Sequence, residues 1–391
     1  MRNGFTTGSC AAAASKAAVY MLLTGKEKKS ITIDTPKGIT YTAEILEIKR
    51  DERTVSCAVK KDSGDDPDVT KGALIFSTVS FLEGSNLDKS KKDEVVQQES
   101  LDQRTDDKDD FKIIIEGGKG VGKVTKPGLD QPVGEAAINS VPRQMIEKEV
   151  RDVCNLFDIK EDLKVVISVP EGEEIAKHTF NPKLGIEGGI SIIGTSGIVE
   201  PMSTQAVLDT IKIELKQRKA LGFDYVAISP GNYGLDFMRD TYGYDLDKSV
   251  KCSNFIGITT DYAVELGFKE VIFVGHIGKL IKVAGGIMNT HSKEADCRME
   301  IISALGIKHK VPVEVLEKIL NCVTTEEAGK LLKECNKADE VFSDAAKKVC
   351  ENLERRELGK LKVECILFSK ELGELAKSES AEAFVNRLVN E

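Results

Sequence analysis

Residues 188–203, which read GGISIIGTSGIVEPMS, constrain the fold of this chain more than any other stretch. The apolar run ISII that begins at Ile190 is rich in β-branched residues and is typical of a buried strand. The small residues at 194–197 break this run. A segment with helical periodicity follows over 204–221, opening near Pro201, where proline suits a first turn. Strand, turn and helix form the unit from which parallel α/β sheets are built, although a turn that binds nothing fits the stretch equally well.

The same alternation continues toward the C-terminus and predicts a Rossmann-like, parallel α/β domain over residues 188–391. Helical segments separate its further strands. We expect these strands at 225–229, 271–274 and 363–368.

Residues 1–187 mix strands and helices irregularly, which predicts an α+β domain. A joint rich in glycine and proline over 178–189 marks the expected boundary between the two domains. Charged residues fill about half of the positions at 85–110, and few apolar residues interrupt them. We therefore expect an exposed, charged excursion there.

Composition excludes several classes of protein. The 391 residues are 41% hydrophobic and 30% charged, as in ordinary soluble globular proteins, and no eighteen-residue apolar run predicts a membrane span. The nine cysteines are scattered and form no CxxC pair, which favours reduced thiols in a cytoplasm over disulfides or a zinc site. A net charge of −9 and the absence of tryptophan argue against a nucleic-acid partner.

Hydroxyl residues precede a run of alanines near the N-terminus. Thr6, Thr7 and Ser9 stand before AAAA, so they predict a helix N-cap followed by a helix that can approach a sheet closely. Such a helix N-terminus also suits a carboxylate or phosphate. A capped, closely packed helix that binds no anion explains the same residues, and without other evidence it is the favoured explanation.

A glycine-rich segment follows the expected strand at 111–117. It does not open into a helix, as the loop of common nucleotide-binding proteins must, because the sequence KVTKPG that follows indicates more strand and a turn. We expect a tight hairpin with exposed N–H groups that suits carboxylates, and an arginine at the start of the next helix, near Pro142. The candidate anion-binding residues here are Gly118, Lys119, Gly120, Lys123, Lys126 and Arg143.

Three small-residue turns follow expected strands of the second domain. Because parallel strands end at the same edge of a sheet, these turns should converge on one ligand site. The candidate residues are Thr195, Ser196, Gly197, Pro230, Gly231, Asn232, Tyr233, Gly234, Gly275, Gly278 and Lys279.

Two of the four histidines, His276 and His291, stand beside these small polar loops, and Asn289 and Thr290 accompany the second. A histidine near neutral pKa can act as an acid or base, although a lone histidine more often only stabilises a loop. Between the two, His276 should point into the cleft because it directly follows a strand.

Long, ordered blocks of this chain resemble the CbiD family between residue 4 and about residue 306. They read GFTTGSCAAAASKAA, GDDPDV, EGGKGVGKVTKPGLDQPVGEAAINSVPRQMI, NPKLGIEGGISIIGTSGIVEPMS, SPGNYG, KCSNFIG and VGHIGKLIKVAGGIMNTHSKEAD. The resemblance implies transfer of a methyl group from S-adenosylmethionine (SAM) to ring carbon 1 of cobalt-precorrin-5B, giving cobalt-precorrin-6A in anaerobic cobalamin biosynthesis. Cobalt then belongs to the substrate, and the protein needs no metal site.

The resemblance names no catalytic residue, so the roles rest on physical argument. We expect SAM at the three small-residue turns. The carboxylates of the substrate should lie at the glycine hairpin, the first helix and the Asn289–Thr290 segment, with His276 and His291 as candidate catalytic residues. A homo-oligomer is compatible with this assignment. Two alternatives remain: a dinucleotide-dependent oxidoreductase, for which residues 229–231 offer no ribose-binding acid, and a tetrapyrrole carrier that does not bind SAM.

Overall fold

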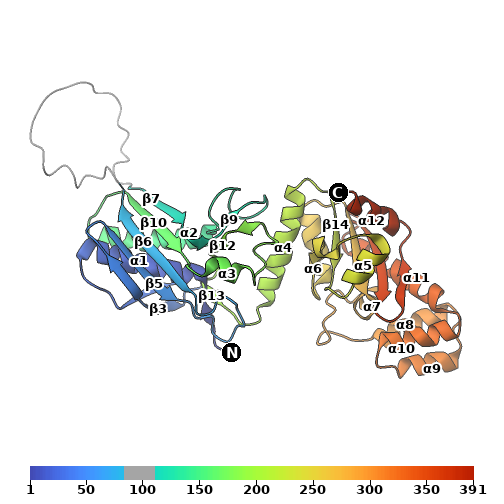
Figure 1. Ribbon diagram of the computed structural model, residues 1–391. Coiled ribbons are helices and arrows are strands. Elements are labelled where there is room, and N and C mark those ends of the chain that lie inside the picture. Colours follow the sequence, from blue (N-terminus) through green and yellow to red (C-terminus); the bar gives the residue numbers. More distant parts are fainter. Residues whose placement is uncertain (83–110) are drawn as a thin grey trace, which may run out of the picture. The chain divides into compact units, whose positions relative to one another are not determined.

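The computed structural model describes residues 1–82 and 111–391 and has a mixed α/β fold (Figure 1). The charged excursion expected at 85–110 lies outside the described residues. The chain divides into two compact units, Met1–Ser203 and Thr204–Glu391, so the division falls later than the boundary expected at residue 187. None of the helices in the described residues is long and apolar enough to cross a membrane.

A five-stranded sheet forms the centre of the first unit. Its strands alternate buried and more exposed residues, as expected for a sheet with one covered face. All neighbours pair antiparallel except the last two, which are parallel. In spatial order the strands are β4 (Leu46–Arg50), β5 (Thr54–Lys60), β6 (Leu74–Phe81), β10 (Leu163–Ser168) and β7 (Ile113–Gly117), and a separate hairpin joins β2 (Ser30–Asp34) to β3 (Thr40–Glu44).

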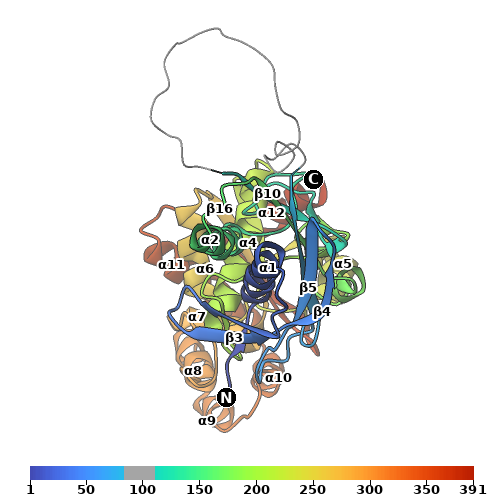
Figure 2. The ribbon, with the colours of Figure 1, turned by 90° about the vertical axis from the view of Figure 1, so that its left-hand side faces the viewer.

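Helix α1 (Thr7–Thr24) lies beside α2 (Ser140–Leu156) and packs against β5 and β6 (Figure 2). The predicted cap is confirmed, because Thr6 Oγ1 accepts a hydrogen bond from the backbone N–H of Ser9 at 3.2 Å. The small alanine side chains are completely buried, which lets the helix approach the sheet closely.

The stretch 188–203 belongs to the first unit, so its expected place in the second domain's parallel sheet is wrong. Strand β12 (Gly189–Ile190) pairs in parallel with β8 (Gly120–Val121), and β13 (Ile198–Val199) pairs antiparallel with β1 (Gly4–Phe5). The reason is the turn between them. Gly194 has a φ of +140°, and a Cβ there would lie 2.2 Å from Thr6 Oγ1. The chain therefore folds back onto the start of α1, and α4 (Thr204–Ala220) begins later than Pro201.

The second unit is built on a five-stranded sheet whose first four strands are parallel and whose last is antiparallel. All three strands expected here, at 225–229, 271–274 and 363–368, are confirmed. The two edge strands carry no apolar run and were not predicted. In spatial order the strands are β15 (Val250–Lys251), β14 (Tyr225–Ser229), β16 (Glu270–His276), β17 (Lys362–Ser369) and β18 (Gly373–Lys377).

Helices cover both faces of this sheet. One face packs against α4, α6 (Ile256–Glu265), α7 (Ile277–Ala284) and α11 (Ala338–Arg356), and the other against α5 (Leu235–Tyr242) and α12 (Ala381–Val389). Three further helices lie between α7 and α11 in the chain: α8 (Arg298–Lys308), α9 (Val313–Leu320) and α10 (Thr325–Glu334). The short remaining elements are β9 (Lys123–Val124), α3 (Gly172–Ala176), β11 (Ile186–Glu187) and a 3-10 turn, η2 (Leu246–Lys248).

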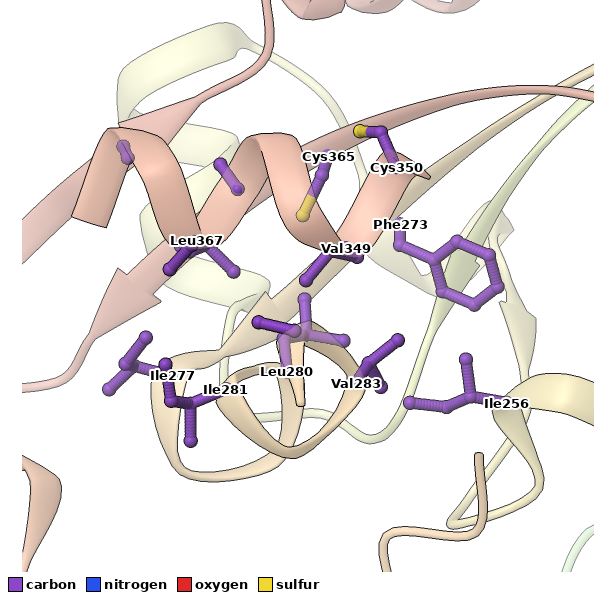
Figure 3. Close-up of a cluster of buried hydrophobic side chains, with 14 of the residues drawn as sticks. Ile256, Phe273, Ile277, Leu280, Ile281, Val283, Val349, Cys350, Cys365 and Leu367 are labelled. Atoms are coloured by element: carbon purple, nitrogen blue, oxygen red, sulfur yellow. The ribbon is translucent and has the colours of Figure 1, made fainter. Parts of the chain in front are cut away.

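The apolar face of α7 packs into the core next to the edge of the sheet where the parallel strands end. Figure 3 shows Leu280 and Val283 of α7 packed with Val349 of α11 and with Cys365 and Leu367 of β17. These side chains are buried, and removing a buried leucine side chain from such a core costs about 2–5 kcal/mol. The first turn of α7 is therefore held rigidly where β16 ends.

Candidate functional site

The order in which the chain adds strands to the sheet reverses between β14 and β16 of the second unit. From β14 the chain crosses to β15 on one side, and it then returns to β16 on the other side of β14. The turns after β14 and β16 thus leave the sheet in opposite directions. In open α/β sheets a crevice forms at such a point, outside the carboxyl ends of the strands, and ligands bind there.

A pocket of about 260 Å³ lies at this point. Its walls come from the turns after β14 and β16, from the end of β17, and from the first residues of α8 and α10. The lining residues are Pro230, Gly231, Tyr233, Val274, Gly275, His276, Gly278, Lys279, Arg298, Thr324, Thr325, Glu326 and Phe368.

Two of the three predicted turns meet in this pocket. Pro230, Gly231 and Tyr233 line it from one turn, and Gly275, His276, Gly278 and Lys279 line it from the other. Asn232 and Gly234 lie on the first of these turns without lining the pocket, and a Cβ on Gly234 would meet the Phe368 ring at 2.8 Å.

The third turn is elsewhere, so the expectation that all three converge at one sheet edge is wrong for Thr195, Ser196 and Gly197. These residues belong to the first unit, where the Gly197 carbonyl accepts hydrogen bonds from Thr6 N at 3.1 Å and Ser9 Oγ at 2.7 Å. The local sequence pattern predicted the position of the other two turns correctly. The position of this third turn instead depends on β12 and β13, which pair with strands far away in the sequence.

His276 caps α7 and contacts α10. Its Nδ1 accepts a hydrogen bond from Gly278 N at 3.2 Å, so the ring proton lies on Nε2, which is 2.8 Å from Glu326 Oε1. The ring also stands edge-on to Phe368, with centroids 5.7 Å apart. Both nitrogens thus have protein partners. This arrangement matches the loop-stabilising alternative, and a catalytic role for His276 stays a prediction.

His291 lies outside the pocket lining. It is exposed, and its Nδ1 accepts a hydrogen bond from Lys293 N at 3.1 Å. The neighbouring Asn289 pairs with Phe255 in an isolated β-bridge, and Thr290 N donates to the Asn254 carbonyl at 2.9 Å. The buried Lys282 ammonium holds this segment through the Thr290 carbonyl. The roles expected for these residues in catalysis and substrate binding stay predictions.

The two cationic side chains of the pocket are held by the protein. Lys279 Nζ donates to the carbonyls of Pro230 at 2.9 Å and Ser253 at 3.3 Å, and burial lowers the pKa of this lysine. Arg298 donates hydrogen bonds to the Asp296 carboxylate through Nε at 2.5 Å and Nη2 at 2.9 Å, and these bonds raise the pKa of the guanidinium. Lys279 thereby ties the turn after β14 to the first turn of α7.

Sequence reasoning missed the wall that comes from α10. The sequence TTEE at 324–327 was a usable signal, because it forms a capping box. Thr324 Oγ1 accepts from Glu327 N at 3.2 Å, and Glu327 Oε2 accepts from Thr324 N at 3.1 Å. The pattern predicts where α10 begins. That this start faces β16 follows only from the packing of α8–α10, so Thr324, Thr325 and Glu326 could not be assigned to the site.

In the first unit, the hydroxyl residues proposed as anion ligands already have protein partners. Thr7 Oγ1 accepts from Ile193 N at 2.9 Å, and Ser9 Oγ donates to the Gly197 carbonyl. Together with Thr6 they are buried beneath residues 191–197. This geometry matches the capped, closely packed helix, and their role in substrate binding stays a prediction.

The glycine-rich segment forms β8 and β9 without opening a helix, as expected, but its N–H groups are not all exposed. Gly118 N donates to the Ile167 carbonyl at 2.7 Å and Gly122 N to the Ile190 carbonyl at 2.9 Å, so the expectation of exposed N–H groups is wrong at these positions. The glycines serve close packing instead. A Cβ on Gly120 would lie 1.8 Å from the Val169 carbonyl oxygen.

The charged side chains around these glycines differ in what they contact. Lys119, Lys123 and Lys126 are exposed, and Lys126 Nζ reaches the Lys183 carbonyl at 3.2 Å. Arg143 donates to the carbonyls of Ile138 and Ile115, both at 2.9 Å. Arg143 therefore ties α2 to β7, whereas Lys119 and Lys123 point to solvent. In residues 1–82 and 111–391, no cluster of three or more His, Cys, Asp or Glu side chains is arranged to hold a metal.

Comparisons with known proteins match one protein family over most of the chain. The family model CbiD matches residues 1–201, and the model of the CbiD C-terminal domain matches residues 289–379. A relative from Ruminiclostridium cellulolyticum is 44% identical over 94% of this chain and 89% of its own length. One from Alkaliphilus metalliredigens is 44% identical over 100% of this chain and 96% of its own. Both are named cobalt-precorrin-5B C(1)-methyltransferase.

A solved structure of a cobalamin biosynthesis protein (cbiD) from Archaeoglobus fulgidus is 27% identical, covers 76% of this chain and 84% of that chain, and has a TM-score of 0.37. The family matches and the near full-length identity of the relatives establish the family without it. The chain belongs to the CbiD family.

Proposed function

We propose that this protein is a cobalt-precorrin-5B C(1)-methyltransferase that takes its methyl group from SAM. The observation that carries the proposal is the identity of 44% to relatives of that name over almost the whole of both chains. The substrate is then a cobalt-containing tetrapyrrole, and its cobalt arrives with it.

We further propose that the second unit is a Rossmann-like module and that SAM binds in its pocket between β14 and β16. Three features support this assignment. The pocket lies where the strand order reverses, it combines apolar walls with a few polar groups, and the ring of Tyr233 is 79% exposed at its margin. An exposed aromatic ring offers a flat apolar surface for a purine.

SAM, when bound, supplies an electrophilic methyl group on a sulfonium that is already a good leaving group. The chain then has to align this group with an electron-rich ring carbon and to exclude water. Lys279 fixes one wall by holding the Pro230 carbonyl, and His276 fixes the other by joining α7 to Glu326. Neither task requires a proton transfer from these residues.

A direct assay tests the enzymatic proposal. Purified protein is incubated with cobalt-precorrin-5B and SAM labelled with ¹³C in its methyl group, and the corrinoid is analysed by mass spectrometry and NMR. We expect one labelled methyl group on ring carbon 1. A protein that binds the corrinoid in calorimetry but neither binds SAM nor forms product would instead be a tetrapyrrole carrier.

His276→Ala should impair binding of SAM rather than chemistry. The variant loses the cap of α7 and the contact to Glu326, and these contacts shape the pocket. We expect the dissociation constant for SAM to rise about fivefold, while the single-turnover rate at saturating SAM and substrate changes less than threefold. His276→Asn, whose side chain can also cap a helix, should retain most of the affinity. A hundredfold slower single turnover with normal binding would instead make His276 a catalytic residue.

We also propose that the exposed lysines of the glycine-rich segment contact substrate carboxylates. Lys119→Ala combined with Lys123→Ala removes two solvent-facing charges from an otherwise acidic protein. The affinity for the corrinoid should fall, and so should its dependence on salt, because screening acts on exposed charge pairs. Titrations at low and high salt measure both effects. Lys26→Ala with Lys29→Ala, which removes two exposed lysines elsewhere in the same unit, is the matched control. Wild-type binding by the Lys119/Lys123 variant would refute the contact.

A further inference from the structure

The ionisable groups of the pocket are not equivalent. The Arg298 guanidinium is neutralised by two hydrogen bonds to Asp296, and the Lys279 ammonium is directed at the carbonyls of Pro230 and Ser253. Both cations are thus held by protein oxygens, but only Arg298 is paired with an anion, because the partners of Lys279 are uncharged carbonyls. Glu326 is the carboxylate that remains among the lining residues.

The hydrogen-bond donors to Glu326 are uncharged hydroxyl groups, and the charges of Arg298 and Lys330 act on its carboxylate from a greater distance. Its Oε1 lies 2.8 Å from His276 Nε2 and accepts a hydrogen bond from Ser369 Oγ at 3.4 Å, and its Oε2 accepts one from Thr325 Oγ1 at 3.1 Å. Because His276 Nδ1 accepts a hydrogen bond from Gly278 N, the imidazole is neutral in this arrangement. In the part of the chain that the structure describes, no lysine or arginine lies within ion-pair distance of this carboxylate.

The surroundings of Glu326 strengthen the electric field of its carboxylate in the pocket. Glu326 stands in the first turn of α10, where the helix dipole stabilises an anion. Its side chain is only 17% exposed, so water screens it less than a surface carboxylate. Two hydrogen bonds and the contact with His276 hold the carboxylate in one orientation at the pocket wall.

We infer that Glu326 makes the pocket selective for a cationic methyl donor over its neutral product. The inference rests on the proposed function, in which SAM occupies this pocket. When the methyl group moves to the ring carbon, the S–CH₃ bond breaks and its electron pair stays on sulfur. The sulfonium thereby becomes the neutral thioether of S-adenosylhomocysteine. A fixed anion in the wall favours the first species and not the second, which promotes binding of the donor and release of the product.

The test compares both ligands in a set of variants. Calorimetry gives the dissociation constants of SAM and S-adenosylhomocysteine for wild type, Glu326→Gln, Glu326→Asp and Glu327→Gln. Glutamine at 326 keeps the size of the side chain and an oxygen that can face His276 but carries no charge, and aspartate keeps the charge. Glu327→Gln removes a charge from the next residue, which is exposed and does not line the pocket, and glutamine can still complete the capping box.

We expect Glu326→Gln to weaken binding of SAM about tenfold and binding of S-adenosylhomocysteine less than twofold, while Glu326→Asp and Glu327→Gln keep the preference of the wild type. Taking the ratio of the two ligands within each variant cancels effects on folding and on pocket shape. Equal weakening of both ligands by Glu326→Gln would overturn the inference and leave SAM in the pocket. Wild-type affinity for both ligands in this variant would overturn the inference and argue against SAM at this wall of the pocket. Failure of the wild-type protein to bind SAM would overturn the proposed function along with it.

Discussion

Gly231→Val should weaken binding of SAM at least tenfold while the melting temperature stays within a few degrees of wild type. Gly231 lines the pocket, its φ is not in the left-handed region, and a Cβ built on it meets no atom within 4 Å. A valine side chain is therefore tolerated by the backbone and extends into space that the ligand needs. An unchanged melting temperature identifies the effect as local.

The neighbouring residue provides the control for this measurement. Asn232 lies on the same turn and is exposed, but it does not line the pocket, so Asn232→Val should bind SAM as the wild type does. Calorimetry on both variants, with thermal unfolding in parallel, is sufficient. Wild-type affinity in a folded Gly231→Val protein would remove SAM from this pocket without contradicting the methyltransferase assignment.

Gly120→Ala should destabilise the first unit by about 3 kcal/mol or more. Gly120 has a φ of +74°, and its Cβ would lie 1.8 Å from the Val169 carbonyl oxygen and 2.9 Å from the carbonyl carbon. Since these atoms are backbone, no side-chain rotation relieves the overlap. The segment after β10 and β8 itself must move apart, which disturbs the pairing of β8 with β12.

Gly134→Ala is the control variant that shows how much of the destabilisation comes from backbone strain and how much from steric overlap. Gly134 also has a positive φ, +95°, but a Cβ there meets nothing within 4 Å. Its substitution should cost only the left-handed strain, about 1 kcal/mol. Urea denaturation of the two variants measures the difference. Equal losses of unfolding free energy in the two variants would mean that position 120 requires glycine only for its backbone conformation. The overlap with the Val169 carbonyl would then contribute nothing to the destabilisation.

The sequence predicted those elements whose pattern is complete within a few residues. The apolar runs of β14 and β16 and the Thr6 cap of α1 are local signals, and each forms as expected. The turns at 230–234 and 275–279 could be assigned to one site because both follow neighbouring parallel strands. Local pattern and tertiary structure agree there.

The same reasoning failed for 188–203, whose pattern is just as regular. Its strands pair with residues near 4 and 120, and the turn at Gly194 lies so close to Thr6 that a side chain at 194 would overlap with it. Periodicity carries no information about such distant partners. Glu326 and Arg298 were missed for a related reason, since they reach the pocket from helices whose packing against the sheet edge is a property of the whole unit.

The pairing of β1 with β13 has a consequence for the order of events during synthesis. Gly4 pairs with Val199, so residues near 4 leave the ribosome long before their partner, which emerges only when the unit is nearly finished. Contacts of such large sequence separation slow folding, because the intervening chain loses entropy before the contact contributes any stability. Until then the first turn of α1 lacks the carbonyls of 193 and 197 that hold it. The start of α1 thus stays accessible to chaperones and proteases until the residues around 199 have been made.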